Sequence, residues 1–256
     1  MTGPRTQVVR YGGHPSQFAE VWTPDSVSIH GAVLLLHGGW WRSRHDLHLM
    51  DALASDLCDQ GHLVWNLEYR RIDGDGGGWP ESLLDVMNAV QDLCAGPVTV
   101  DPASVVAVGH SAGGHLALHA AKAAGLGGVV ALAPITDLAR SEQEGLGEGA
   151  TAVFLDETDT TLPIYDEASP LHQLPIGKPQ LIVHGTEDWR VPVAHSRDYA
   201  TKAVSAGDDV QLVEVQGGDH MFVLEPDHAY WAQAREWLKT VTPRPTSAFV
   251  TTRTLS

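Results

Sequence analysis

The sequence has few cysteines, few basic residues and no long apolar run. Two of its 256 residues are cysteines, Cys58 and Cys94, which are too few to form a disulfide framework. Lys and Arg together number 16, against 32 Asp and Glu, so the formal net charge is −16. Such a surface repels phosphate backbones and anionic lipids. We therefore expect no nucleic-acid partner and no membrane association.

Targeting and cofactor signals are missing as well. The first residues contain no apolar core of signal-peptide length, and apolar stretches such as Ala32–Leu36 are far too short to span a membrane. The 14 histidines are scattered without an HExxH pattern, and no glycine-rich phosphate loop follows an apolar segment. These absences predict a cytoplasmic protein with no metal site and no other cofactor.

Short apolar segments alternate with longer segments of helical pattern. Most of the apolar segments contain no alternating polar residues, which is typical of parallel strands that are covered on both faces. We expect strands at Phe18–Trp22, Ala32–Leu36, Leu63–Leu67, Val105–Val108, Val129–Ala133, Gln180–Val183 and Val210–Val215. We expect helices at Leu47–Gln60, Glu81–Cys94, Gly114–Ala124, Val193–Ala206 and Asp227–Val241. This order predicts one doubly wound, mostly parallel α/β domain over residues 1–242.

Two segments depart from the alternation. Residues 136–175 form a long, acidic interval between two predicted strands, and intervals of that length are usually functional or locally folded. We interpret this interval as a small cap or lid, with a mobile surface excursion as the alternative. Residues 243–256 are rich in Thr, Ser and Pro, which predicts a flexible C-terminal tail.

The strongest chemical signal is the pentapeptide Gly109-His-Ser-Ala-Gly113, a G-x-S-x-G pattern. The pattern places Ser111 on a sharp turn between a strand and a helix, where glycines avoid collisions across the turn. An apolar strand precedes it and an Ala/Leu-rich segment follows, so Ser111 stands at a helix N-terminus that favours developing negative charge. Ser111 is therefore the candidate nucleophile.

A serine nucleophile needs a base, and the base needs an orienting acid. In this strand–helix context the chain order is serine, then Asp or Glu, then His, each after a later strand. Asp188 follows the predicted strand at 180–183, and His220 follows the one at 210–215. Glu187 is the alternative acid, but the shorter side chain of Asp188 suits a tight turn better. The predicted triad is Ser111, Asp188 and His220.

A Gly-Gly turn follows the strand that ends at Leu36. Its sequence is His37-Gly-Gly-Trp-Trp41, and a chain of glycines can bring backbone N–H groups close to a substrate oxygen. We predict an oxyanion hole formed by Gly38 or Gly39 together with Ala112. Removal of one such donor costs about 3 kcal/mol of transition-state stabilisation. His37 is interpreted as structural.

Eight tryptophans stand in a chain with 7% aromatic residues. Three of them, Trp40, Trp41 and Trp189, lie beside the motifs described above. They suggest an aromatic wall for the substrate pocket. Packing in the core is the alternative for each of them.

Four segments together resemble the α/β-hydrolase superfamily: HGGWW at 37–41, GHSAGG at 109–114, HGTEDWRVP at 184–192 and GGDH at 217–220. The closer resemblance is to its small esterase and arylformamidase branch, the kynurenine formamidase-like proteins. That branch carries an HGG-aromatic-Trp loop and an Asn/Asp-Tyr-Arg motif, which is Glu68-Tyr69-Arg70 here, a departure at the first position. The resemblance spans roughly Gly31 to Trp237.

The residues and the resemblance imply a serine hydrolase that cleaves small carboxylic esters or aryl formamides through an acyl-enzyme, without a cofactor. A prolyl-oligopeptidase-like small peptidase is the second candidate, ranked lower because such peptidases usually carry a large additional domain. A non-catalytic hydrolase-fold binding protein is the third, although such proteins normally lack a member of the triad. The acyl group, the leaving group and the oligomeric state stay open, with a homodimer as one option.

Overall fold

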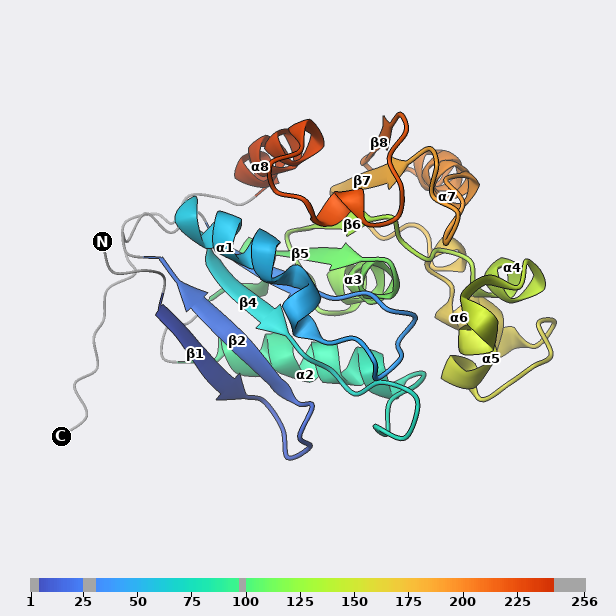
Figure 1. Cartoon of the computed structure of the whole chain (residues 1–256), viewed down its shortest axis with the longest axis horizontal. Helices are drawn as coiled ribbons and strands as arrows, with labels where there is room; N and C mark the ends of the chain where they lie inside the picture. The colour runs from blue at the N-terminus through green and yellow to red at the C-terminus, as the bar shows by residue number, and fades with distance from the viewer. Residues whose placement is uncertain (1–4, 25–30, 97–99, 242–256) are drawn as a thin grey trace.

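The computed structural model describes residues 5–24, 31–96 and 100–241 (Figure 1). The C-terminal tail that the sequence predicts at 243–256 lies outside these ranges. No helix in the described ranges has the length and apolar character that a membrane crossing requires.

The described part of the chain contains one eight-stranded sheet in the order β1-β2-β4-β3-β5-β6-β7-β8. Its strands are β1 Arg5–Arg10, β2 Phe18–Thr23, β3 Ala32–Leu36, β4 Leu63–Leu67, β5 Val105–His110, β6 Gly128–Leu132, β7 Gln180–Gly185 and β8 Val210–Val215. Strand β2 pairs antiparallel with β1 and β4, whereas the neighbours from β4 to β8 run parallel. The predicted mostly parallel sheet is confirmed.

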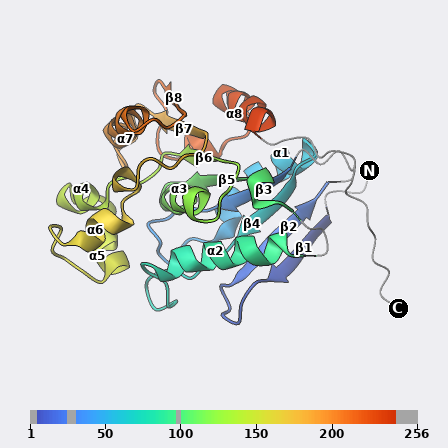
Figure 2. The same cartoon turned by 180° about the vertical axis from the view of Figure 1, so that it is seen from behind.

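Helices cover both faces of this sheet (Figures 1 and 2). One face carries α2 Glu81–Cys94, α3 Ala112–Ala123 and α7 Ala194–Ser205, and the other carries α1 Asp51–Asp59 and α8 Ala229–Val241. In β3, Leu34 and Leu36 pack toward the first face, whereas Val33 and Leu35 pack toward the second. All four side chains are completely buried. This double burial is why the strand has no polar alternation.

Two elements at the N-terminal side differ from the prediction. Strand β1 was not predicted, because its side chains from Thr6 to Val8 are exposed and its composition is polar, as is common at a sheet edge. The predicted helix at 47–60 begins as a 3-10 turn, η1 Leu47–Met50, before α1. The Asp46 carboxylate accepts the His48 N–H and fixes the start of that turn.

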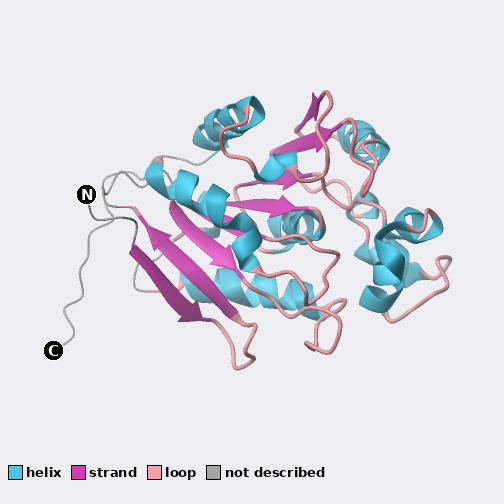
Figure 3. Ribbon diagram, viewed as in Figure 1, coloured by secondary structure: helices cyan, strands magenta, loops and turns pink. Residues whose placement is uncertain are grey.

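Residues 136–175 fold into short helices at the carboxyl end of the parallel strands (Figure 3). These are α4 Leu138–Gln143, η3 Leu146–Gly149, α5 Ala150–Leu155, α6 Pro163–Ala168 and η4 Pro170–His172. The Ala168 carbonyl oxygen lies 2.7 Å from His115 Nε2 and 2.9 Å from His119 Nε2, both on α3. The segment, which we call the cap, is thus anchored to the helix that begins at Ser111. Its closing as a lid stays a prediction.

Candidate active site

Ser111 lies on a strained turn between β5 and α3, with φ 54° and ψ −115°. Residues other than glycine rarely adopt this backbone conformation, and residues with such strained backbones are often found at functional sites. The flanking glycines make the turn feasible. A Cβ atom on Gly109 would lie 2.2 Å from the Gly113 carbonyl oxygen, and one on Gly113 would lie 2.1 Å from the Leu36 carbonyl oxygen. Only glycine fits these two positions, as the motif predicts.

Asp188 and His220 meet although 32 residues separate them. Asp188 follows β7, His220 follows β8, and these two strands are parallel neighbours. Asp188 Oδ2 lies 2.6 Å from His220 Nδ1, and both residues are buried. A carboxylate at Nδ1 holds the proton there, which leaves Nε2 free to act as a base.

The Asp188 carboxylate is held in its charged form. Its Oδ1 accepts the N–H groups of Arg190 and Val191, both at 2.9 Å. Burial by itself raises the pKa of Asp188, but hydrogen bonds from His184 and His220 outweigh it and hold the pKa well below the ordinary range. Glu187, the alternative acid, has an exposed side chain. The structure therefore places Asp188, and not Glu187, against the base.

His184 is a supporting residue that the sequence reasoning missed. Its Nε2 lies 3.1 Å from Asp188 Oδ2 and 2.8 Å from the Val191 carbonyl oxygen. Because both of these atoms only accept, Nε2 carries the proton, and the Ser196 hydroxyl donates to Nδ1 at 2.7 Å. The sequence offers one signal for this role: His184 stands at the end of an apolar predicted strand, four residues before the predicted acid Asp188.

His110 connects the loop that carries His220, the candidate base, to the turn that carries Ser111, the candidate nucleophile. Its Nε2 donates to the His220 carbonyl oxygen at 3.1 Å, and the two rings lie 4.7 Å apart. Burial, followed by the neighbouring His220, lowers the pKa of His110 well below its usual value, so its ring is neutral. The Ser111 hydroxyl is buried without a hydrogen-bond partner among the described residues. Catalytic hydrogen bonds are often long before substrate binds.

The predicted oxyanion loop packs directly on this turn. A Cβ atom on Gly38 would lie 2.7 Å from His110 Nδ1 and 3.0 Å from Ser111 Cβ. Gly39 has φ 113°, and a Cβ atom there would strike the His45 ring. Ala112 is the first residue of α3, where backbone N–H groups lack intrahelical acceptors. The structure therefore brings Gly38 next to Ser111, which Ala112 directly follows.

Buried hydrogen bonds and ring contacts hold the predicted oxyanion loop, residues 37–41, in place. His37 Nε2 lies 3.0 Å from Glu68 Oε1, and the Tyr69 hydroxyl donates to the His37 carbonyl oxygen at 2.7 Å. The His37 and Tyr69 rings stack with centroids 4.4 Å apart. Glu68 Oε2 also accepts the Leu47 N–H at 3.1 Å. Glu68, which the sequence reasoning noted only as a departure from a motif, thus holds both His37 and the segment after the loop.

The three tryptophans of the predicted aromatic pocket lie in different environments. Trp41 is completely buried and stacks on Phe154 of the cap at 4.1 Å. Trp40 is also buried and packs against Gly147, whereas Trp189 is 75% exposed beneath the guanidinium of Arg190. Trp40 and Trp41 pack edge to face with ring centroids 6.1 Å apart, so these two form one buried cluster and Trp189 lies at the surface. Their role in a substrate pocket stays a prediction.

A pocket of about 270 Å³ lies between α4 and α7, and none of the triad residues lines it. Its lining residues are Asp137, Arg140, Leu171, His195, Asp198, Thr201 and Lys202. Arg140 forms ion pairs with Glu144 at 2.6 Å and with Asp198 at 2.7 Å. The first pair lies within the cap, and the second joins the cap to α7 beside the pocket.

Comparisons with known proteins cover the residues of this site. Residues 69–242 match the prolyl oligopeptidase family. Esterase LipC of Mycobacterium tuberculosis is 26% identical over 246 residues, which cover 84% of this chain and 59% of LipC, so the chain spans about three fifths of that relative's length.

Two solved structures have a similar fold. A truncated carbohydrate esterase from gut microbiota has a TM-score of 0.83 at 19% identity, covering 94% of this chain and 96% of that one. A thermophilic esterase from Thermogutta terrifontis has a TM-score of 0.75 at 22% identity, covering 95% of each chain. The predicted α/β-hydrolase fold is thereby confirmed.

The matched family is that of the second candidate, the prolyl-oligopeptidase-like small peptidase. The arylformamidase branch, which the motifs at 37–41 and 68–70 resemble, is not among these matches, so the resemblance holds at the level of the superfamily. The matched region includes Ser111, Asp188 and His220 and extends over more than half of the sequence. The chain belongs to the prolyl oligopeptidase family of the α/β-hydrolase superfamily.

Proposed function

We propose that this protein is a serine hydrolase that cleaves small carboxylic esters through an acyl-enzyme intermediate. The observation that carries the proposal is the buried Asp188–His220 pair, 2.6 Å apart, tied through His110 to the strained turn at Ser111. Relatives and structural neighbours named as esterases favour ester substrates.

In the acylation half-reaction, Ser111 Oγ attacks the carbonyl carbon of the ester. His220 Nε2 takes the hydroxyl proton, and the carbonyl electron pair moves onto the oxygen to form a tetrahedral oxyanion. The backbone N–H of Ala112 and that of Gly38 or Gly39 donate to this oxyanion. Asp188 stabilises the imidazolium that forms, because its buried carboxylate already bonds Nδ1.

Acylation is completed when the tetrahedral intermediate collapses and the bond to the leaving group breaks. The imidazolium of His220 gives its proton to the departing alcohol. In deacylation, water gives a proton to the same Nε2 as it attacks the acyl carbon. The second tetrahedral intermediate then collapses, the bond from the acyl carbon to Ser111 Oγ breaks, and Oγ takes the proton from His220 as the acid leaves. Proton and charge return to their starting places, so the cycle uses no other reactant than water.

The burial of the site favours a small acyl group. Ser111 is 1% exposed and His220 is 4% exposed, so little room surrounds the reacting carbonyl before substrate binds. Formyl and acetyl groups fit this restriction better than long chains. Aryl formamides, whose cleavage the motif resemblance implies, are therefore a second substrate class for the same residues.

Peptide bonds are the alternative that the family match favours. The same triad and oxyanion loop can cleave a peptide, with the imidazolium protonating an amine instead of an alcohol. The two candidates differ in the leaving group, so substrates with matched acyl groups separate them.

The test compares wild type, Ser111→Ala and the control Ser205→Ala, which changes an exposed serine of α7. The substrates are 4-nitrophenyl acetate and butyrate, formanilide, N-formylkynurenine and an aminoacyl 4-nitroanilide. We expect kcat/KM to be highest for the acetate or a formamide, and Ser111→Ala to abolish turnover while Ser205→Ala retains it. Retained activity in Ser111→Ala would refute the serine mechanism, and fastest cleavage of the aminoacyl anilide would favour the peptidase.

A further inference from the structure

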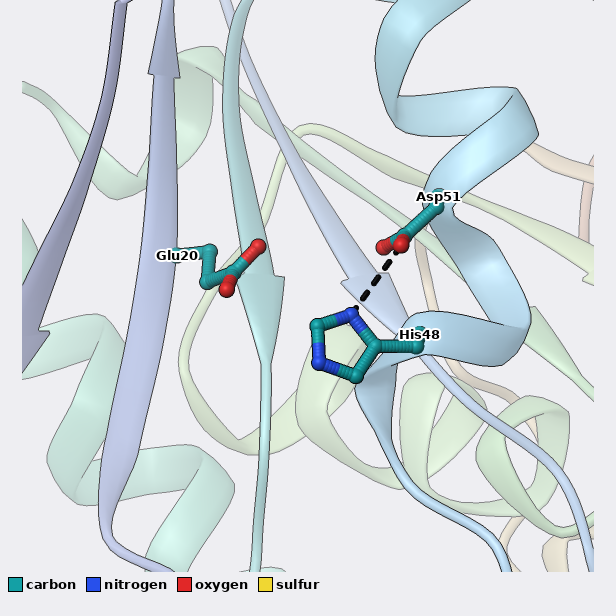
Figure 4. Close-up of side chains that lie close together, drawn as sticks. All are labelled: Glu20, His48 and Asp51. Carbon is teal, nitrogen blue, oxygen red and sulfur yellow. Dashed lines mark hydrogen bonds and ion pairs between the residues drawn. The ribbon is translucent and has the colours of Figure 1, made fainter.

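A second polar cluster lies apart from the triad, on the side of the sheet near β1. Glu20 comes from β2, His48 from η1 and Asp51 from the first turn of α1. One nitrogen or oxygen atom from each of the three side chains lies within 4.8 Å of the others. Figure 4 shows the Glu20 carboxylate pointing from its strand toward His48 and Asp51. Strands β4 and β3 separate β2 from β5, which leads to Ser111.

The geometry of the three side chains follows from their elements. His48 and Asp51 are three residues apart across the junction of η1 and α1, which places them on one helical face, and His48 Nδ1 lies 3.0 Å from Asp51 Oδ2. The Glu20 side chain extends from β2 toward His48 and Asp51. Glu20 is two residues from Trp22, which packs with α1 and α8, so its side chain shares that face.

The buried amide of Asn66 donates a hydrogen bond to the cluster. Asn66 of β4 lies opposite Glu20 in the β2–β4 register and is completely buried. Its Nδ2 donates to Asp51 Oδ1 at 3.1 Å and to the Leu47 carbonyl oxygen at 3.0 Å. Outer contacts of this kind orient the ligating carboxylates of metal sites.

The cluster has more acceptors than donors. Asn66 Oδ1, on the amide group that bonds Asp51, is buried and has no hydrogen-bond partner within the described part of the chain. Two carboxylates, those of Glu20 and Asp51, thus lie within reach of one ion together with His48, and a cation would offset their negative charge.

We propose that Glu20, His48 and Asp51 bind one divalent transition-metal ion of the Zn²⁺ type, with Asn66 orienting Asp51. An imidazole among the ligands favours Zn²⁺ over Mg²⁺ and Ca²⁺, which prefer oxygen alone. Three protein ligands leave the fourth tetrahedral position for water. Tetrahedral ligands lie about 3.4 Å apart at zinc bond lengths, so these partly exposed side chains need to close by little more than an ångström.

The ion would join a strand to a helix that packs against the same face of the sheet. It would connect β2, near the edge of the sheet, to the start of α1, and binding to the folded chain alone raises stability by mass action. The expectation of no metal site came from scattered histidines without an HExxH pattern, and such a pattern cannot include Glu20 and His48, which lie far apart in the chain. Only the antiparallel return of β2 beside β4 brings them together.

The experiment measures metal binding to the EDTA-treated, dialysed protein by isothermal titration calorimetry, with Zn²⁺ and Ca²⁺ in parallel, and melting temperature with and without Zn²⁺. We expect one Zn²⁺ per chain, a higher melting temperature with Zn²⁺ and weaker binding of Ca²⁺. Glu20→Gln and His48→Gln each lower the Zn²⁺ affinity at least tenfold. The matched control is His172→Gln, an exposed histidine 3.6 Å from the single carboxylate of Asp166, which leaves the affinity unchanged.

Several results overturn the proposal. These are the absence of saturable Zn²⁺ binding, unchanged affinity in Glu20→Gln, an equal loss in His172→Gln, and tighter binding of Ca²⁺ than of Zn²⁺. The melting temperature of each EDTA-treated variant establishes that it is folded. Ester hydrolysis by Glu20→Gln stays at the wild-type rate, since Glu20 takes no part in the triad or the oxyanion loop.

Discussion

Replacing Asp188 with asparagine tests the site most sharply, because the carboxylate accepts four hydrogen bonds in fixed directions. Oδ1 accepts two backbone N–H groups, and Oδ2 accepts from His184 and His220. An amide has one oxygen and one NH₂ group. The oxygen must face the two backbone donors, since NH₂ there would leave both unsatisfied.

The NH₂ group of the new asparagine therefore faces His220 Nδ1. A nitrogen that receives a hydrogen bond cannot also donate one, so Nδ1 loses its proton and Nε2 gains it. His220 then has no lone pair on Nε2 with which to accept the proton of Ser111. The analogous change in serine proteases lowers kcat by about 10⁴, or about 5 kcal/mol of transition-state stabilisation. The lost charge-assisted bonds also lower the free energy of unfolding by about 2–4 kcal/mol.

The assay is kcat/KM for an acetate ester, together with urea unfolding of the same preparations. Glu187→Gln is the matched control, because this exposed neighbour offers the same change of a carboxylate to an amide. We expect Glu187→Gln to match wild type in both measurements. Activity of Asp188→Asn above a tenth of wild type, or equal losses in the two variants, would refute the assignment of the acid.

Three further outcomes follow from packing and titration. Trp41→Ala should lower the free energy of unfolding by about 3–5 kcal/mol and slow acetate and butyrate esters alike; a changed preference for chain length would instead make the ring a pocket wall. Burial lowers the pKa of His119 from 6.5 to about 4, so the unfolded chain takes up the proton first as the pH falls. The contribution of His119 is a loss of stability of up to about 3 kcal/mol between about pH 6.5 and 4, and His119→Gln should remove this contribution from the urea-unfolding profile. Gly113→Ala should destabilise by at least about 3 kcal/mol, because its Cβ would overlap the Leu36 carbonyl, whereas Gly13→Ala, with open space around it, should be neutral in the same unfolding assay.

The parallel sheet could be predicted because its strands are buried on both faces and therefore carry an unbroken apolar signal. Strand β1 carries no such signal, since its outer position leaves Thr6, Gln7 and Val8 exposed. The cap helices were missed because each is only a turn or two long and because three glycines, Gly145, Gly147 and Gly149, interrupt the first part of the segment. Helices this short depend on tertiary contacts and not on their own periodicity.

The candidate triad could be named in advance because the fold fixes the order of such residues along the chain, and the structure brings two of its members, Asp188 and His220, together. The residues that support them could not, because their contacts are visible only in three dimensions. His37 meets Glu68 across 31 residues, and neither side chain belongs to a pattern with a fixed spacing. Trp189 is next to the acid in the sequence yet points into solvent, because the turn buries Asp188 and thereby directs the following side chain outward.

The hydrogen bond from His110 to the carbonyl of His220 has a consequence for engineering and for divergence within the fold. Position 110, the second of the pentapeptide, and the loop at 216–222 hold each other in place through this hydrogen bond, although the loop follows β8 at the far edge of the sheet. A base loop transplanted from a hydrolase with a different residue at that position would arrive without its anchor. Directed evolution of the loop is therefore best carried out with position 110 varied in the same library.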